Sequence, residues 1–288
     1  MSATVVLLVI ASALAHATWN ALLKRSTDPE SSIAAMMSVG SAISVAIALG
    51  LGVPAPPLAG IVWCLVAGLL EAGYFVTLAR ALSRAPLGSV YTIVRGGALI
   101  IVWPVSAIFL DERVSLGRAA GTALVVLGLA ATGFGERTKP AGELVGRPNT
   151  PRSGLVIAAI CALFVGGYHL AYKLGLSSGA RPEAVNAISL TTGSMLNLAR
   201  LGRTRLPLVL AASRREGVKI LIGGALGSIG FLLFLSAMKN AGAGVVLTLR
   251  NTSILFAQVL GFALGERPRR LAVIGAALVV AGAVLLAS

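Results

Sequence analysis

Residues 88–113 read GSVYTIVRGGALIIVWPVSAIFLDER, and residues 244–267 read GVVLTLRNTSILFAQVLGFALGER. Each stretch is an apolar segment with one arginine near its middle, Arg95 or Arg250, and each ends in an acidic residue followed by arginine. A helix of about twenty residues spans the roughly 30 Å hydrocarbon core of a bilayer. Both stretches therefore predict membrane-spanning helices, and the landmarks they share indicate an internal repeat.

Long apolar segments joined by short polar connections make up the rest of the chain. Its 288 residues are 57% hydrophobic and 12% charged, with a mean hydropathy of +0.91. A soluble domain carries about a quarter charged residues, so this composition excludes an ordinary globular fold. Spans are expected at 3–23, 32–51, 58–80, 87–109, 116–134, 153–174, 183–200, 218–238, 243–264 and 270–287. Because lipid offers backbone groups no partners, the sequence predicts an all-α polytopic membrane protein of ten transmembrane helices.

The repeat extends beyond the two quoted stretches. Trp19 and Lys24 of the first span correspond to Tyr168 and Lys173 of the sixth at one constant offset. Two copies of five spans each must insert in opposite senses, which gives an inverted repeat, an arrangement suited to alternating access. We expect a first five-helix repeat at 1–136, a central connecting loop at 137–152 and a second five-helix repeat at 153–288.

The formal net charge of +14 reflects how the chain is oriented in the membrane rather than binding to nucleic acid. Lysines and arginines concentrate in the odd-numbered connections between spans, and no polar domain is present to offer a basic face to a duplex. Basic residues favour the cytoplasmic side of a membrane. We therefore expect both termini outside, in an inner membrane protein surrounded by lipid.

The sequence resembles the drug/metabolite transporter superfamily, in particular its EamA-type ten-helix transporters. The resemblance is carried by AHATWNALLKR at 15–25, Leu-Asp-Glu-Arg at 110–113, Gly-Glu-Arg-Pro at 265–268 and the layout of five plus five spans. It implies a transporter of small metabolites. Multidrug relatives use a glutamate in the first helix for protons, whereas this first span carries His16 and no carboxylate.

Three ionisable residues fall near the middles of their predicted spans: Glu71, Arg95 and Arg250. A charged side chain at the membrane centre costs roughly 2.5–3.5 kcal/mol on insertion scales, so such residues normally face a cavity or a partner. The planar guanidinium suits carboxylate or phosphate. We expect the two arginines to bind an anionic substrate, with Glu71 as counter-ion or coupling group. The alternative is a structural pair of Glu71 with one arginine.

Polar and aromatic residues of the first and sixth spans complete the candidate site. Trp19, Asn20, Tyr168 and His169 are expected to line the substrate cavity, with helix packing as the alternative for the aromatic rings. His16 is a candidate for proton coupling because imidazole titrates near neutral pH. Packing of a neutral histidine is its alternative interpretation.

Together these features predict a secondary transporter that moves a small anionic or zwitterionic metabolite, in the direction of export, by alternating access. Proton or ion coupling is expected because the sequence has no phosphate-loop GxxxxGK[ST] pattern, and neither HExxH nor GxSxG occurs. We expect no enzymatic activity, cofactor or metal. The alternative is a membrane-embedded enzyme or flippase that acts on a lipid phosphate.

Overall fold

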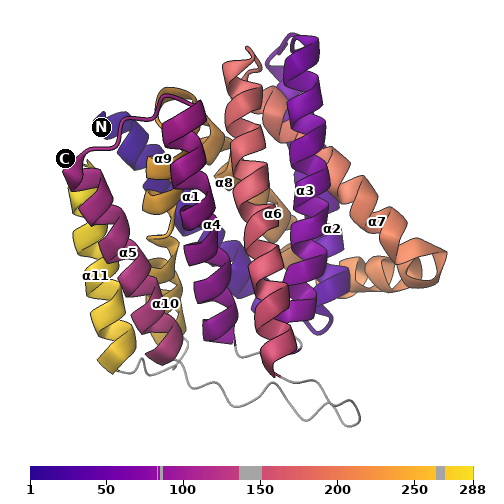
Figure 1. Ribbon diagram of the computed structural model, residues 1–288. Coiled ribbons are helices and arrows are strands. Elements are labelled where there is room, and N and C mark those ends of the chain that lie inside the picture. Colours follow the sequence, from indigo (N-terminus) through magenta and orange to yellow (C-terminus); the bar gives the residue numbers. More distant parts are fainter. Residues whose placement is uncertain (83, 85–86, 136–150, 264–269, 288) are drawn as a thin grey trace. The chain divides into compact units, whose positions relative to one another are not determined.

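The computed structural model describes residues 1–82, 84, 87–135, 151–263 and 270–287, and every regular element within them is a helix (Figure 1). The helices are α1 (Ala3–Lys24), α2 (Pro29–Gly50), α3 (Leu58–Leu82), α4 (Leu87–Phe109), α5 (Leu116–Gly135), α6 (Pro151–Ser177), α7 (Pro182–Arg215), α8 (Gly217–Asn240), α9 (Ala243–Arg250), α10 (Ser253–Ala263) and α11 (Arg270–Ala287). Most of the predicted connecting loop, and Glu266, lie outside the described residues.

The helices have the length and composition that a membrane requires. Among the described residues, seven stretches are long and apolar enough to cross a bilayer: Ala3–Leu23, Glu30–Gly50, Leu58–Leu78, Ser153–Ser177, Gly217–Asn240, Ala243–Leu260 and Arg270–Ala287. Two shorter apolar stretches, Ile93–Phe109 and Leu116–Thr132, lie in α4 and α5. The predicted fold class, an all-α polytopic membrane protein, is therefore confirmed.

The described residues form two compact units, and each unit takes helices from both halves of the sequence. Unit 1 comprises Met1–Ser2, Gly73–Leu170 and Gly242–Ser288, and unit 2 comprises Ala3–Ala72 and Ala171–Ala241. These units do not follow the predicted division into 1–136 and 153–288, which describes the repeat in sequence. That division stays a prediction about the origin of the two halves.

Unit 1 is organised by the packing of α5 along α11. A Cβ atom on Gly128 would lie 2.6 Å from the carbonyl oxygen of Gly275, and one on Gly275 would lie 2.5 Å from that of Gly128. Gly121 and Gly282 approach each other in the same way, at 2.9 Å and 2.5 Å. Small residues allow membrane helices this close approach, where packing replaces the hydrophobic effect as the driving force.

These glycine pairs are reciprocal. One offset in the sequence relates Gly121 to Gly275 and Gly128 to Gly282, and the same offset relates Glu112 to Glu266. Equivalent residues therefore exchange partners across an antiparallel helix pair, as a two-fold axis requires. The close packing of α5 with α11 thus carries the signature of the inverted repeat.

Unit 2 shows the same signature where α2 packs against α7. The Ser38 hydroxyl contacts the Ser194 hydroxyl at 3.3 Å, and Ser41 contacts Thr191 at 2.7 Å. A single offset relates Ser38 to Thr191 and Ser41 to Ser194, so these contacts are again reciprocal. Hydroxyl pairs between helices satisfy polar groups that lipid would leave without partners.

The α7 helix is long, polar and bent. The burial of Asn186, Ser189, Ser194 and Asn197 shows that its first part faces protein rather than lipid. At Gly202 the backbone turns (φ 65°, ψ −178°), in the left-handed region that favours glycine. The segment after the bend is helical as well, whereas the sequence predicted that the seventh span ends at residue 200.

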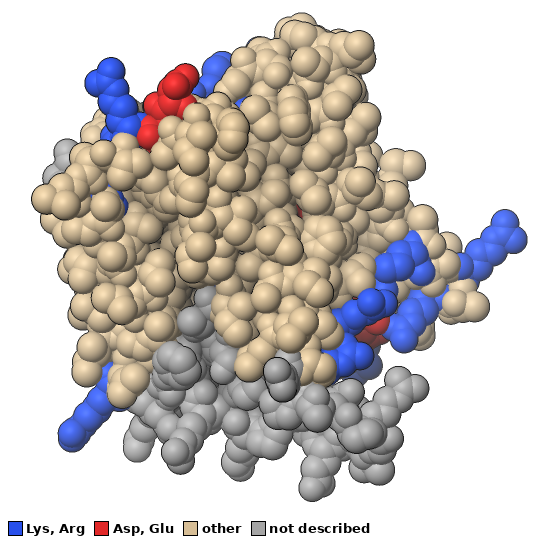
Figure 2. Space-filling model, viewed as in Figure 1, with Lys and Arg blue, Asp and Glu red and all other residues tan. Residues whose placement is uncertain are grey.

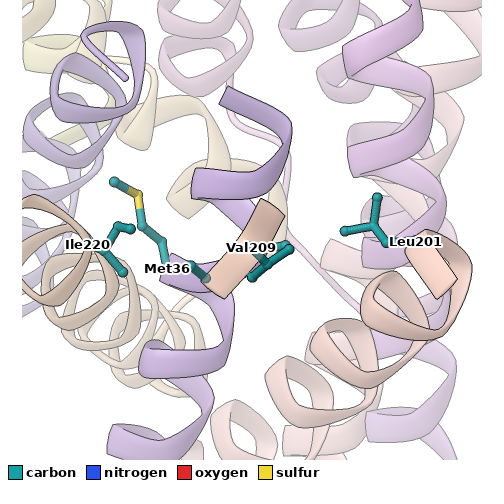
Figure 3. Packing of buried hydrophobic residues seen from close by; sticks show 6 residues of the cluster. Met36, Leu201, Val209 and Ile220 are labelled. Carbon is teal, nitrogen blue, oxygen red and sulfur yellow. The ribbon is translucent and has the colours of Figure 1, made fainter. Parts of the chain in front are cut away.

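A buried cluster holds the bent end of α7 to its neighbours. Val209 lies after the bend and packs with Met36 of α2 and Ile220 of α8, and Figure 3 shows Met36 beside Ile220. Glu30, at the start of α2, pairs with Arg200 at 2.8 Å and with Arg205. Figure 2 shows basic side chains gathered at this edge of α7. These ion pairs join the basic residues on either side of the bend in α7 to the start of α2.

The ninth predicted span differs from the structure in one respect. The sequence predicted one helix over 243–264, but α9 ends at Arg250 and α10 begins at Ser253. The backbone N–H groups of Asn251 and Thr252 donate to the carbonyl groups three residues earlier instead of four. The helix thus tightens and breaks at a run of polar residues, which hydropathy alone does not reveal.

Candidate functional site

The break between α9 and α10 places a group of polar residues inside unit 1. Arg250 is 3% exposed, and the three residues after it, Asn251, Thr252 and Ser253, are buried as well. Every residue of α9 is buried. Broken helices in membrane proteins occur where the backbone is enclosed by protein or lines a cavity, and in transporters they commonly form the binding site.

The α4 helix contributes the second arginine to this group. Arg95 Nη1 donates to Asn251 Oδ1 at 3.2 Å, so the arginine of the fourth span contacts the residue directly after Arg250. Eight residues along α4, Trp103 Nε1 donates to Thr248 Oγ1 at 3.0 Å. Two side-chain hydrogen bonds therefore fix α4 against the broken helix. The structure brings together the two arginines that the repeat related in sequence.

A carboxylate from another part of the chain holds the start of α9. Glu112 lies in the connection after α4, and its Oε2 and Oε1 accept from the backbone N–H groups of Gly244 and Val245, each at 2.9 Å. The first N–H groups of a helix have no partner within the helix, and its positive end favours an anion. Glu112 therefore caps α9, a helix that lies far away in the sequence.

Two aromatic residues of α6 belong to the same unit. Tyr168 stacks on His169 with ring centroids 4.3 Å apart, and meets Tyr74 edge to face at 5.9 Å. His169 Nδ1 lies 2.6 Å from the carbonyl oxygen of Val165, which can only accept, so Nδ1 carries the proton. Tyr168 and His169 are both buried, and they lie in the same unit as Arg95 and Arg250.

The remaining predicted site residues belong to unit 2. Glu71 of α3 is 3% exposed and lies against α7, where a Cβ atom on Gly193 would come within 3.2 Å of its Oε2. On α1, Trp19 Nε1 donates to His16 Nδ1 at 3.3 Å, and Asn20 Nδ2 donates to the His16 carbonyl oxygen at 2.7 Å. His16, Trp19 and Asn20 thus form one hydrogen-bonded group on a single helix.

Lys173 has a structural role within unit 2. Its Nζ donates to the carbonyl oxygens of Met238 and Ala241, each at 2.8 Å. These carbonyls lie at the end of α8, where a helix leaves acceptors without partners and favours a positive charge. The sequence did not reveal this role of Lys173, because the contact joins residues of two different helices.

Comparison with known proteins relates the second half of the chain to a protein family. Residues 152–288 match the EamA-like transporter family, which confirms the resemblance found in the sequence. This segment is similar to the EamA-like transporters. A crystal structure titled "Crystal structure of protein" matches with a TM-score of 0.74 at 20% identity, covering 100% of this chain and 99% of that one. The whole chain therefore shares its fold with a solved protein. No curated protein matches significantly.

The match points to a membrane transporter of the drug/metabolite type. Within the matched residues, Asn251 and Thr252, beside Arg250, were not singled out from the sequence. The signal was present as four consecutive polar residues, Arg-Asn-Thr-Ser, in an otherwise apolar span. A polar run of this length in a membrane helix indicates a break or a binding site rather than lipid-facing surface.

Proposed function

We propose that this transporter carries a small anionic or zwitterionic metabolite, and that Arg95 and Arg250 bind its anionic group. The observation that carries the proposal is the hydrogen bond from Arg95 to Asn251, which places the first arginine beside the residue that follows the second. Guanidinium groups stay charged in proteins and bind carboxylate or phosphate through paired N–H donors.

The cost of burying these charges supports a role in transport. Arg250 is almost completely buried, and the sequence retains it within an apolar span. Because a buried arginine is expensive in a membrane, intramembrane arginines usually mark substrate or ion pathways. An anionic cargo would offset part of that cost each time it binds.

The remaining parts of the proposal concern direction and coupling. The inverted repeat suits alternating access across an inner membrane. We propose export of the metabolite, driven by an ion gradient, with Glu71 and His16 as the groups that exchange protons. Tyr168 and His169, which belong to the same unit as the arginines, would contact the cargo. We also propose that both termini lie outside, because lysines and arginines concentrate in the odd-numbered connections.

The test is ligand-dependent stabilisation of the purified protein, followed by transport in proteoliposomes. A panel of carboxylates, phosphomonoesters and zwitterionic amino acids is compared with a quaternary ammonium cation. At least one anionic or zwitterionic compound should raise the unfolding temperature. R95Q and R250Q should abolish both this shift and transport of the same compound.

The matched control is R181Q, because Arg181 is exposed and pairs with Glu183 at a connection. This variant should behave as the native protein. If R95Q and R250Q both keep native stabilisation and transport, the arginines do not form the anion site and the proposal fails.

A further inference from the structure

The hydrogen bond between Arg95 and Asn251 also fixes the orientation of the Asn251 amide. A guanidinium has donors and no acceptor, so the atom of Asn251 that faces Arg95 must be the carbonyl oxygen Oδ1. The amide nitrogen Nδ2, with its two N–H donors, then points away from Arg95. The amide oxygen and nitrogen of an asparagine are usually hard to tell apart, but here the contact with Arg95 assigns both atoms and the direction in which the N–H groups point.

Two polar atoms at the helix break lack partners among the described residues. Asn251 Nδ2 and Thr252 Oγ1 make no hydrogen bond there, although Asn251 is only 1% exposed and Thr252 2%. Thr248, one turn earlier, shows the usual arrangement, since its hydroxyl donates to the carbonyl oxygen of Gly244. Because buried donors without acceptors are costly, native proteins keep them mainly where something else binds.

We propose that Asn251 Nδ2 and Thr252 Oγ1 donate hydrogen bonds to a second oxygen-bearing group of the cargo. The inference rests on the proposed function, in which Arg95 and Arg250 bind the first anionic group. The cargo class is then a small organic acid with two separate acceptor groups, for example two carboxylates or a carboxylate and a hydroxyl. Asn251 sets the selectivity between such acids and simple monocarboxylates.

The physical reason is the cost of leaving donors unpaired. When a monocarboxylate occupies the arginines, Asn251 and Thr252 meet a methyl group instead of an oxygen and remain without an acceptor. A site built to hydrogen-bond a substrate group rejects the analogue that lacks the group far more strongly than an apolar site rejects an added one. Selectivity should therefore depend on Asn251, and overall anion binding on the arginines.

The experiment compares succinate with butyrate, which has the same four-carbon chain but a methyl group in place of the second carboxylate. Dissociation constants are measured by thermal unfolding of the purified native protein and its variants. The native protein should prefer succinate by roughly tenfold or more. N251A should bring the two constants close together, and R95Q and R250Q should weaken binding of both acids.

Two further variants make the test independent of a general loss of folding. N251D keeps an oxygen toward Arg95 but adds a negative charge and an acceptor where Nδ2 was, so it should weaken binding of both acids and remove the preference for succinate. T252V has the same shape as the native side chain without the hydroxyl, and it should lower the preference partly. The control N240A removes an amide at the end of α8 that donates to Ser236; its preference should remain native.

The outcomes separate this inference from the function on which it rests. Binding that depends on the arginines, with a succinate preference unchanged in N251A and N251D, overturns the role of Asn251 alone and leaves water as the partner of its amide. Binding of neither acid, or binding that is unchanged in R95Q and R250Q, overturns the anion site and this inference with it.

Discussion

Glu112 and Gly244 are joined by a hydrogen bond of 2.9 Å from the backbone N–H of Gly244 to the carboxylate, and a second bond reaches Val245. Glu112 lies in the connection between α4 and α5, whereas Gly244 lies in the first turn of α9, the helix that ends in Arg250. A single carboxylate therefore holds one end of α9, and the hydrogen bond from Arg95 to Asn251 holds the other. The position of Arg250 depends on both.

Removal of this carboxylate should destabilise the protein. In E112A, α9 loses two hydrogen bonds to a charged acceptor, each worth about 1.5–3 kcal/mol, so the free energy of unfolding should fall by a few kcal/mol. Thermal unfolding in detergent measures the change. E183A, which breaks an exposed pair with Arg181, is the control and should change stability by about 0.5 kcal/mol or less. Equal effects of the two substitutions would contradict the capping role.

The contact of α5 with α11 should tolerate no added side-chain atom. G128A places a methyl group 2.6 Å from the carbonyl oxygen of Gly275, and such overpacking should cost roughly 1–3 kcal/mol. G227A on α8 is the matched control, because a Cβ atom there meets nothing within 4 Å. It should leave the unfolding temperature unchanged or raise it slightly, since alanine favours helix. A native unfolding temperature in G128A would mean that the helices separate easily.

Glu216 should make stability depend on pH in the acidic range. The backbone N–H of Thr27 donates to this carboxylate at 3.2 Å and holds its pKa below the usual value near 4.5; burial opposes the shift, and Lys219 adds to it. Because the pKa is lower in the folded state, the stabilisation is present above pH 4.5 and is lost as the pH falls through the folded value.

The measurement is the unfolding temperature of the native protein and of E216Q as the pH is lowered from neutral to the acidic range. The native protein should lose more stability than E216Q over this interval, because the glutamine cannot titrate. Parallel curves for the two proteins would show that the contact with Thr27 contributes no pH-dependent stability.

The proposed orientation can be tested with single cysteines. Cys64 and Cys161 are buried, so they should react slowly with a reagent that cannot cross the membrane. S115C, in the exposed connection after α4, should be labelled from outside intact cells. T204C, after the bend of α7, should be labelled only when the cytoplasmic side is opened. The reverse pattern would invert the topology.

The lengths of the apolar segments alone predicted most of the helices. The bounds of α3, α4 and α5 follow the predicted spans within about two residues, because backbone groups in lipid must be satisfied inside each helix. The same criterion missed the break after Arg250 and extended the ninth helix through it. Hydropathy averages over a window, and the strongly apolar residues on either side of Asn251 and Thr252 conceal a short polar run.

The candidate site was predicted only in part. The sequence singled out Arg95 and Arg250 because charge is rare and costly in an apolar span. It gave no sign that Asn251 joins them, or that Glu112 holds α9, since each contact links residues that are distant in the chain. The pairing of helices across the two halves was equally hidden, because contact between elements depends on shapes that a hydropathy pattern does not encode.

By itself, the sequence determined that this chain lies in a membrane as helices, and it predicted that its halves are related and that a few arginines lie within apolar spans at a cost. These properties follow from composition and local periodicity. Only the tertiary structure decided which donors remain at the broken helix, since a hydrogen bond depends on the direction and distance between two groups. Arg95 reaches the oxygen of Asn251 and leaves its nitrogen free to donate, and no residue count could have shown this.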